Sequence, residues 1–373
     1  MSTKVIKIII FTLMFLYSCK KKEGERIATV HNIYLGDSLC FKLDSLTPNI
    51  LNYFQIVETG PDTTSLVFYN NYSHHVYVYD LYRQNLSTKI LIKNQKLNLV
   101  NFLGFHYISP DSIFFLPEYG ENIYLATDHG HVDYWFPMLD TLNRNKLLDH
   151  RAFQDAPFII NGSNLLINNP YGILPYEGDT SNFLLLNFDL EAQKTNFSLQ
   201  FSAHLKDKNY DNTPYRLLKY CHYKDDLIFY SFGFDPNLYV YDFVKKIHID
   251  TITPKLNHFY IPKFNESMGS DEKWLIFQSS YSFSSIIYNK YNSTINRIIL
   301  RPYDLRDLKS GKQDSEVPKK ASLFTFDLAG TLQSKTDLDN LFVFRNAIVR
   351  PEGIYFQKIN EDENLVVFQL VEF

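Results

Sequence analysis

One pattern recurs six times along this chain of 373 residues. Each unit holds a short apolar segment, a polar or aromatic loop, and a second apolar segment that in most units ends in Asp or Asn. In the first unit the two segments are residues 65–69 and 76–80. Successive units begin 47 to 80 residues apart, and repeats of roughly 40–50 residues with several short strands are typical of propeller blades. The repeat therefore favours an all-β ring of similar sheets.

Further apolar segments flank the units, such as residues 101–106 before the second unit and 132–136 after it, so each repeat supplies four strands. The last unit ends after its third strand, whereas residues 32–44 alternate in polarity and belong to no unit. We predict a six-bladed β-propeller of four-stranded antiparallel blades, in which this N-terminal strand completes the last blade, closes the ring and removes a sheet edge. A β-sandwich with a second domain is the alternative, but the sequence shows no interdomain linker.

The fifth unit is the least regular of the six. We expect residues 273–277 and 286–289 to be its two apolar strands. A polar stretch then covers residues 301–320, and the apolar segment 322–328 follows it. This region is either an insertion in the fifth blade or the displaced outer hairpin of that blade.

Composition agrees with a β fold and limits the partners. The chain has 27 Tyr and 31 Phe, residues that suit half-buried strands better than helices. A formal net charge of -4, with scattered lysines, argues against nucleic acid as a partner. Three cysteines cannot form a disulfide framework. We interpret Cys40 and Cys221 as two buried thiols, with a disulfide between them as the alternative in an oxidising compartment.

Residues 1–18 have the features of a signal peptide. Lys4 and Lys7 form a short positive region, and an apolar run over residues 8–17 follows it. Ten residues match the apolar part of a signal peptide and fall short of the roughly 20 that a membrane-spanning helix needs. The sequence therefore predicts export of the chain.

The apolar run ends in Leu-Tyr-Ser-Cys at residues 16–19, which resembles the lipobox of bacterial lipoproteins. This resemblance implies that Cys19 is lipidated, that residues 19–26 form a polar tether and that the propeller spans residues 27–373. An ordinary signal peptide with an incidental cysteine is the alternative. A lipobox followed by six Tyr-, Phe- and Asn-rich β units is similar to the six-bladed β-propeller lipoproteins of Bacteroidota, many of which carry only a domain-of-unknown-function label. That family implies a fold and a lipid anchor in the outer membrane, but no active-site residue.

An aromatic residue recurs in the loops of five units, six positions after an aliphatic residue of the first apolar segment (Leu66, Ile113, Leu165, Ile228 and Leu275). The aromatic residues are Tyr72, Tyr119, Tyr171, Phe234 and Tyr281. The sixth unit has Asn360 at this position. Such loops share one face of a propeller with the loops that join blades, so we expect the five rings to surround one mouth of the channel and to bind a glycan or a protein segment. The alternative is that each ring packs against the next blade as part of the core.

Five aspartates at or near the ends of apolar strands are interpreted as turn caps, because they fall at outer hairpins far from one another. They are Asp80, Asp128, Asp189, Asp242 and Asp327. The string Asp128-His129-Gly130-His131 is the strongest candidate for a metal site, but it is typical of a tight hairpin turn and has no further ligand nearby. We therefore predict no cofactor and no metal site, while ligands from separate blades that meet in the channel stay open as an alternative.

These features together predict an exported, lipid-anchored propeller that acts as a non-enzymatic binding or scaffold module of the cell envelope. Its partners would be the membrane, through the lipid on Cys19, and a glycan or an envelope protein. The sequence has no nucleophile elbow, phosphate-binding glycine loop or His-Glu-x-x-His motif. A metal-dependent hydrolase or lactonase-like enzyme that uses the central channel is the alternative. In the outer membrane the protein could face the periplasm or the cell surface, and Lys20, Lys21 and Lys22 favour the periplasmic side.

Overall fold

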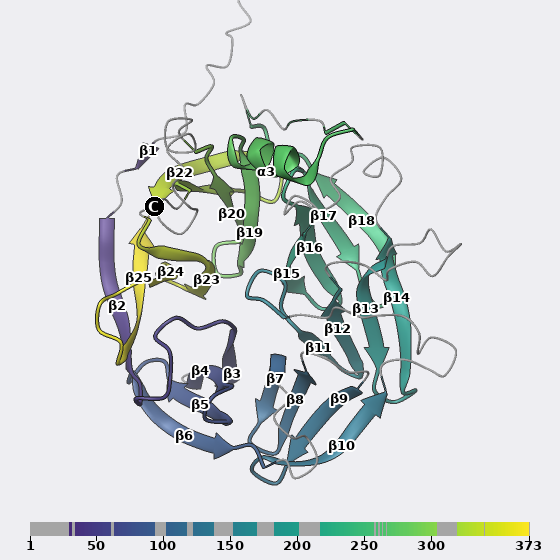
Figure 1. Cartoon of the computed structure of the whole chain (residues 1–373), viewed down its shortest axis with the longest axis vertical. Helices are drawn as coiled ribbons and strands as arrows, with labels where there is room; N and C mark the ends of the chain where they lie inside the picture. Colours follow the sequence, from purple (N-terminus) through teal and green to yellow (C-terminus); the bar gives the residue numbers. More distant parts are fainter. Residues whose placement is uncertain are drawn as a thin grey trace, which may run out of the picture.

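The computed structural model arranges the chain as six β-sheets around a central axis (Figure 1). Each sheet is one blade, and the blades follow one another around the ring in sequence order. This arrangement confirms the predicted six-bladed all-β propeller. The structure describes residues 30–31, 34–60, 63–93, 102–117, 122–137, 152–169, 183–200, 217–256, 259, 262, 264–265, 267–303, 319–338 and 340–372.

In each of the first four blades, four consecutive strands form an antiparallel sheet from the axis outwards (Figure 1). The first blade has β3 (Phe54–Gly60), β4 (Thr63–Asn70), β5 (His75–Asp80) and β6 (Asn85–Leu91). The second has β7 (Phe102–Ser109), β8 (Ser112–Pro117), β9 (Asn122–Thr127) and β10 (His131–Pro137). The third has β11 (Ile159–Asn161), β12 (Asn164–Asn168), β13 (Phe183–Asp189) and β14 (Lys194–Gln200). The fourth has β15 (Leu218–Lys224), β16 (Leu227–Phe232), β17 (Leu238–Asp242) and β18 (Ile247–Ile252).

The fifth blade differs from the sequence-based expectation. Its strands are β19 (Ser282–Asn289), β20 (Thr294–Leu300), β21 (Ala321–Phe326) and β22 (Leu332–Leu338), with β1 (Val30–His31) added in parallel to β22. Residues 286–289, expected in the third strand of the blade, therefore belong to its innermost strand, two positions earlier. The segment 322–328 starts the outer hairpin. Its strand β21 pairs directly with β20, and Ala321 is the partner of Leu300.

The expectation of a strand at residues 273–277 was wrong, because this segment lies in the helix α3 (Ser270–Gln278). Gly269 precedes the helix in an extended conformation, and Asp271 and Glu272 lie in its first turn, where acidic side chains stabilise a helix. A short apolar run does not by itself distinguish a buried strand from a helix. No helix in the described part of the chain is both long enough and apolar enough to cross a membrane.

The sixth blade closes the ring in the predicted way. It contains β23 (Phe342–Arg350), β24 (Gly353–Lys358) and β25 (Leu365–Glu372) from the end of the chain. Its outer strand is β2 (Tyr34–Lys42), which pairs antiparallel with β25, and Phe41 is the partner of Val366. In Figure 1 the purple β2 lies beside the yellow β25. The two ends of the chain therefore form one sheet, and β25 has no open edge.

Aromatic side chains fill much of the core between neighbouring blades. At the junction of the last and first blades, Phe41 of β2 is fully buried, and its ring lies edge-on to Tyr79 at 5.6 Å and to Phe368 at 6.3 Å. Phe54 of β3 lies against the same Phe368 ring at 5.3 Å. Such pairs contribute about 0.5–1.5 kcal/mol each beyond the burial of their area. The abundance of Tyr and Phe thus serves the packing of blade against blade.

The two cysteines in the described residues do not form a disulfide. Both are free, and they lie on different blades, Cys40 on β2 and Cys221 on β15. Cys40 is exposed, which corrects the expectation of two buried thiols. The reason is the alternation of a strand: Leu39 and Phe41 face the core, so the residue between them faces solvent.

Four of the strand-ending aspartates cap turns, as predicted. Asp80, Asp189 and Asp242 each accept hydrogen bonds on Oδ1 from the backbone amides two and three residues later. Asp327 accepts them from the amides two and four residues later. Asp128 instead has a φ of 39° and forms part of the turn itself.

The string with two histidines is the turn of the β9–β10 hairpin. Gly130 has a φ of 103°, and a Cβ at this position would lie 2.3 Å from the backbone oxygen of Leu91, so the turn requires glycine. His129 and His131 on either side of it are exposed. Among the residues that the structure describes, no group of three or more His, Cys, Asp or Glu side chains comes together as metal ligands would.

Candidate functional site

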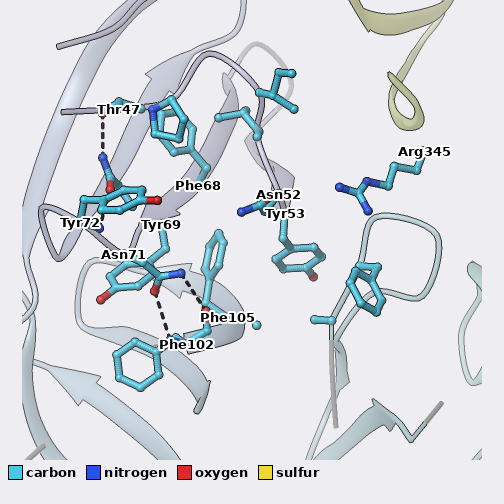
Figure 2. Close-up of a pocket in the computed structure, with 17 residues that line it drawn as sticks. Thr47, Asn52, Tyr53, Phe68, Tyr69, Asn71, Tyr72, Phe102, Phe105 and Arg345 are labelled. Atoms are coloured by element: carbon cyan, nitrogen blue, oxygen red, sulfur yellow. Dashed lines mark hydrogen bonds between the residues drawn. The ribbon is translucent and has the colours of Figure 1, made fainter. Parts of the chain in front are cut away.

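A pocket of about 420 Å³ opens on the face of the ring where the chain passes from one blade to the next (Figure 2). Its walls come from the first two blades, from the innermost strand of the last blade, from residues 152–153 before the third blade, and from residues 43–53, the closing segment that links β2 to β3. Sites for small molecules usually have volumes of roughly 300–1,000 Å³. The pocket therefore has the size of a site for a small ligand or for one end of a larger one.

Aromatic rings form the floor of this pocket. Tyr69 of β4 lies edge-on to Phe102 of β7, with ring centroids 5.5 Å apart. Tyr53 of the closing segment meets Phe105 of β7 in the same way at 5.4 Å. Phe102 and Phe105 are buried, so the neighbouring blades hold these rings in place. The floor thus offers a preformed apolar surface.

Tyr72 stands at the rim of the pocket, in the turn between β4 and β5, with 80% of its surface exposed. The turn is held by Asn70, which is 3% exposed. Asn70 Oδ1 accepts hydrogen bonds from the backbone amides of Tyr72 at 2.8 Å and Ser73 at 3.3 Å. The backbone that carries Tyr72 is therefore fixed, while its ring remains in contact with solvent.

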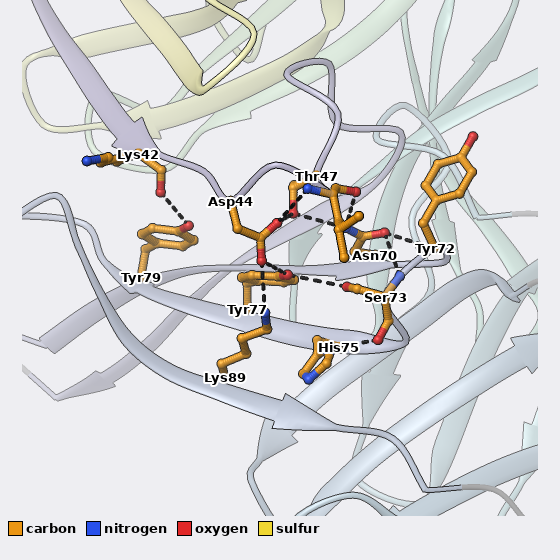
Figure 3. A network of polar contacts seen from close by, with 11 residues as sticks. Lys42, Asp44, Thr47, Asn70, Tyr72, Ser73, His75, Tyr77, Tyr79 and Lys89 are labelled. Atoms are coloured by element: carbon orange, nitrogen blue, oxygen red, sulfur yellow. Dashed lines mark hydrogen bonds and ion pairs between the residues drawn. The ribbon is translucent and has the colours of Figure 1, made fainter.

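The same Asn70 side chain ties this turn to the closing segment (Figure 3). Its Nδ2 donates hydrogen bonds to the backbone oxygen of Leu46 and to Thr47 Oγ1, each at 2.9 Å. The Thr47 hydroxyl in turn donates to Asp44 Oδ1 at 2.7 Å. One buried amide thus positions both the aromatic rim and one wall of the pocket.

Asp44 anchors the start of the closing segment to the first blade. Its Oδ2 accepts hydrogen bonds from the Tyr77 hydroxyl of β5 and, at 2.8 Å, from Lys89 Nζ of β6 (Figure 3). Burial acts to raise the pKa of this carboxyl, but the hydrogen bonds from Lys89, Tyr77 and Thr47 outweigh it and hold the pKa well below its ordinary value. The anchor is therefore charged at neutral pH.

The last blade holds the other end of the closing segment. Asn346 Nδ2 of β23 donates to the backbone oxygen of Leu51 at 2.6 Å, and Gln357 Nε2 of β24 donates to that of Asn49 at 2.7 Å. Both side chains are fully buried. The closing segment is thus bonded to the first blade at one end and to the sixth at the other, so this wall of the pocket exists because the ring is closed.

A bulge in the innermost strand of the sixth blade supplies the charged group of the pocket. Val343 pairs with Gln357 and Ala347 with Phe356, so residues 344–346 are left out of the strand pairing with β24. Bulges of this kind bend a strand and turn a side chain in a new direction. Figure 2 shows Arg345 of the bulge pointing toward Asn52 and Tyr53.

The comparisons with known proteins place the chain in a family. Residues 31–329 match the family described as a domain of unknown function, DUF4221. The chain belongs to this family. A crystal structure of a DUF4221 member from Bacteroides vulgatus is similar, with a TM-score of 0.73 and 17% identity over 91% of this chain and 97% of the other. The resemblance expected from the sequence is thus confirmed for the fold and the family.

A second solved structure, of a candidate exported protein from Bacteroides fragilis, has a TM-score of 0.56 and 10% identity over 93% of this DUF4221 chain and 98% of the other. At such identities both structures show the shared fold alone. The comparison with curated proteins found no match. Cys19 and the signal peptide lie outside the described residues, so the lipid anchor stays a prediction.

The recurring aromatic residues of this DUF4221 chain differ in how far they are buried. Tyr119 and Tyr171 lie outside the described residues. Phe234, in the turn between β16 and β17, is 2% exposed and stacks on Phe232 at 5.6 Å. Tyr281 is half-buried and lies edge-on to Phe259 at 4.9 Å. Both rings pack within the fold, whereas Tyr72 is exposed at the pocket.

The shifted fifth unit explains the position of Tyr281. The alignment that selected it began at Leu275, which lies in α3 and not in a strand. Tyr281 therefore precedes the first strand of its blade, whereas Tyr72 and Phe234 each follow a second strand. Sequence reasoning also missed Arg345, because neither the repeat nor a motif marks a residue whose direction depends on a bulge.

Proposed function

We propose that this DUF4221 protein is an exported, lipid-anchored and non-enzymatic binding module of the cell envelope, and that the pocket beside Tyr72 binds a saccharide. The similar structure of a candidate exported protein supports the envelope location. The signal-peptide features of residues 1–18 and the lipobox at Cys19 support export and anchoring to the outer membrane. The observation that carries the proposal is an exposed Tyr72 ring beside a preformed aromatic pocket.

Sugars match the chemistry of this pocket. A pyranose ring has one face of C–H groups that packs on an aromatic ring, and its hydroxyls form hydrogen bonds with amides. Tyr72 offers an exposed ring, and the exposed Asn52 places an amide near Tyr53 on the opposite side of the pocket (Figure 2). Because the floor and the Tyr72 turn are held by buried contacts, little order is lost when a ligand binds.

Thermal unfolding of residues 20–373 with a panel of oligosaccharides tests this proposal. A ligand at 100 times its Kd stabilises a folded protein by about 2.7 kcal/mol, which raises the Tm by a measurable amount. We expect a rise with at least one saccharide class. No rise with any saccharide would contradict the proposal. A lower Tm in chelator would instead indicate a metal-dependent role for the channel.

The Tyr72→Ala variant links such a rise to the pocket. Because the ring is 80% exposed, its removal should change the free energy of unfolding by no more than about 0.5 kcal/mol while it weakens binding. Tyr82→Ala is the matched control, since Tyr82 is 51% exposed and lies outside the pocket. Equal binding by Tyr72→Ala and the wild-type protein would contradict a role for this rim.

A further inference from the structure

We propose that the ligand of the pocket is an acidic saccharide and that Arg345 receives its carboxylate. This inference rests on the proposed saccharide-binding function and names the class of sugar. It follows from three features of the described residues: the charge of the pocket, the missing partner of Arg345, and the way in which the bulge of β23 is held.

The pocket carries a single positive charge. Seventeen residues line it, and Arg345 is the one charged side chain among them. The other polar groups are amides and hydroxyls, which can bind the neutral parts of a sugar. A cation that faces a partly enclosed aromatic pocket attracts an anion more strongly than a cation on an open surface, because less water screens it.

Arg345 also differs from the other arginines that the structure describes. Three of them form ion pairs with carboxylates. Arg83 Nε lies 3.9 Å from Asp80 Oδ2, and Arg350 Nε lies 2.8 Å from Glu352 Oε1. Arg301 pairs with Asp337. The buried Arg297 donates to backbone oxygens and to a serine hydroxyl. Arg345 makes no hydrogen bond or ion pair with any described residue, so its five N–H donors are available to a ligand.

The bulge holds the backbone beside Arg345 in place. Asn346, the next residue, is fully buried and donates both to the Leu51 oxygen and to Gln357 Oε1. These side-chain bonds hold the bulge at Asn346 against the closing segment and β24, although residues 344–346 have no backbone pairing with β24. The pairing of β23 with β24 is thus interrupted at one bulge, and this bulge directs the unpaired guanidinium of Arg345 into the pocket.

A carboxylate fits this arrangement better than a phosphate. A guanidinium binds a carboxylate through two parallel hydrogen bonds, and one positive charge balances one carboxylate. Phosphate sites usually add further cations or the N-terminus of a helix, and neither is present among the described residues that line the pocket. The aromatic rim beside the charge favours a carboxylate carried on a sugar ring, as in a uronic acid.

Calorimetric titration of residues 20–373 with paired sugars tests the inference. The probes are trimers of galacturonate, mannuronate and glucuronate, each beside its carboxyl-reduced form, which has the same ring linkages without the charge. We expect at least one acid trimer to bind about tenfold or more tightly than its reduced form, because the reduced form cannot make charge-assisted hydrogen bonds with the guanidinium. Its affinity should also fall as salt is added.

Variants assign the preference to Arg345. Arg345→Gln should bind the acid trimer no better than the reduced one, and Arg345→Lys should retain part of the preference, because it keeps the charge but loses the fork of donors. Arg350→Gln is the matched control, since Arg350 lies on the same strand but outside the pocket. Urea unfolding of each variant shows whether the fold is intact.

Each contrary result has its own meaning. Equal binding of acid and reduced trimers would overturn the acidic class while the saccharide function stands. A preference that survives in Arg345→Gln would overturn the assignment to this residue. Absence of binding by every saccharide, acid or neutral, would overturn both proposals, and binding of an acidic peptide alone would assign the pocket to a protein partner.

Discussion

At the scale of single residues, Arg297 of β20 shows how this protein holds a buried charge. Arg297 is fully buried, and its guanidinium donates to the backbone oxygens of Phe232, Asp235 and Pro236 and to the Ser231 hydroxyl. Burial lowers its pKa to about 9, against the opposite effect of the nearby Asp235. The group therefore stays charged at neutral pH and holds the β16–β17 turn against the fifth blade.

His106 on β7 predicts a pH dependence of stability. Its Nδ1 lies within hydrogen-bond distance of the Phe158 backbone oxygen, at 3.0 Å, and of Gln55 Nε2, at 2.8 Å. Burial lowers the pKa of His106 from 6.5 to about 4, although the bond to Phe158 acts in the opposite direction. The unfolded chain therefore binds a proton more readily than the folded protein between these values, so stability should fall as the pH drops from 6.5 toward 4.

The His106→Gln variant isolates this effect. Glutamine does not titrate, so the free energy of unfolding of the variant should depend less on pH in this window than that of the wild-type protein. Urea denaturation at several pH values between about 7 and 4 measures both slopes. Parallel curves for the two proteins would contradict the assignment to His106, since the carboxylates titrate equally in both.

At the scale of one element, the closing strand β2 shows how alternate side chains on a strand join two blades. Leu39 and Phe41 are buried against the first and last blades, while Cys40 and Lys42 face outward. The ring of Phe41 contacts rings on two other strands, Tyr79 on β5 and Phe368 on β25. The strand thus joins the blades by side-chain packing as well as by its pairing with β25.

Two neighbouring substitutions on β2 test this view. Phe41→Ala should lower the free energy of unfolding by about 3–5 kcal/mol, because it leaves a cavity at the junction of the two blades. Cys40→Ala, one residue away on the opposite face, should change it by no more than about 0.5 kcal/mol. Urea denaturation measures both values, and similar losses for the two variants would show that the packing of Phe41 does not close the ring.

At the scale of the whole molecule, ring closure and the pocket depend on the same segment. β2 covers the edge of β25, and residues 43–53 continue from it as a wall of the pocket. The short β1 adds a further contact, since it pairs with β22 of the fifth blade before the chain reaches the sixth. Loss of this N-terminal region should therefore open a sheet edge and weaken the site together.

Complementation by a peptide tests the closure. Residues 45–373 should form oligomers or aggregates, because β25 then exposes unpaired backbone groups along its edge. Addition of a peptide of residues 32–44 should restore the monomer, and the same peptide with Leu39→Asp and Phe41→Asp should not. Size-exclusion chromatography with light scattering gives the mass in each case. A truncated chain that stays monomeric with an unchanged Tm would contradict this role.

The sequence by itself determined the six blades, the closure by an N-terminal strand and the aspartate-capped turns. These features are local or periodic: strand alternation, turn residues and a repeat length are each visible within a few dozen residues. The family comparison agrees with the fold inferred in this way. The same local rules were insufficient at residues 273–277, where a short apolar run forms a helix.

The tertiary structure decided which repeat positions face a ligand. Tyr72 and Phe234 occupy equivalent turns, but Phe234 is buried in a cluster with Phe264 and with Phe277 of α3, whereas Tyr72 remains exposed. Arg345 enters the pocket only because the sixth blade has a bulge opposite the closing segment. Exposure and direction depend on neighbours distant in sequence, so a pattern read along the chain identifies equivalent positions and not their surroundings.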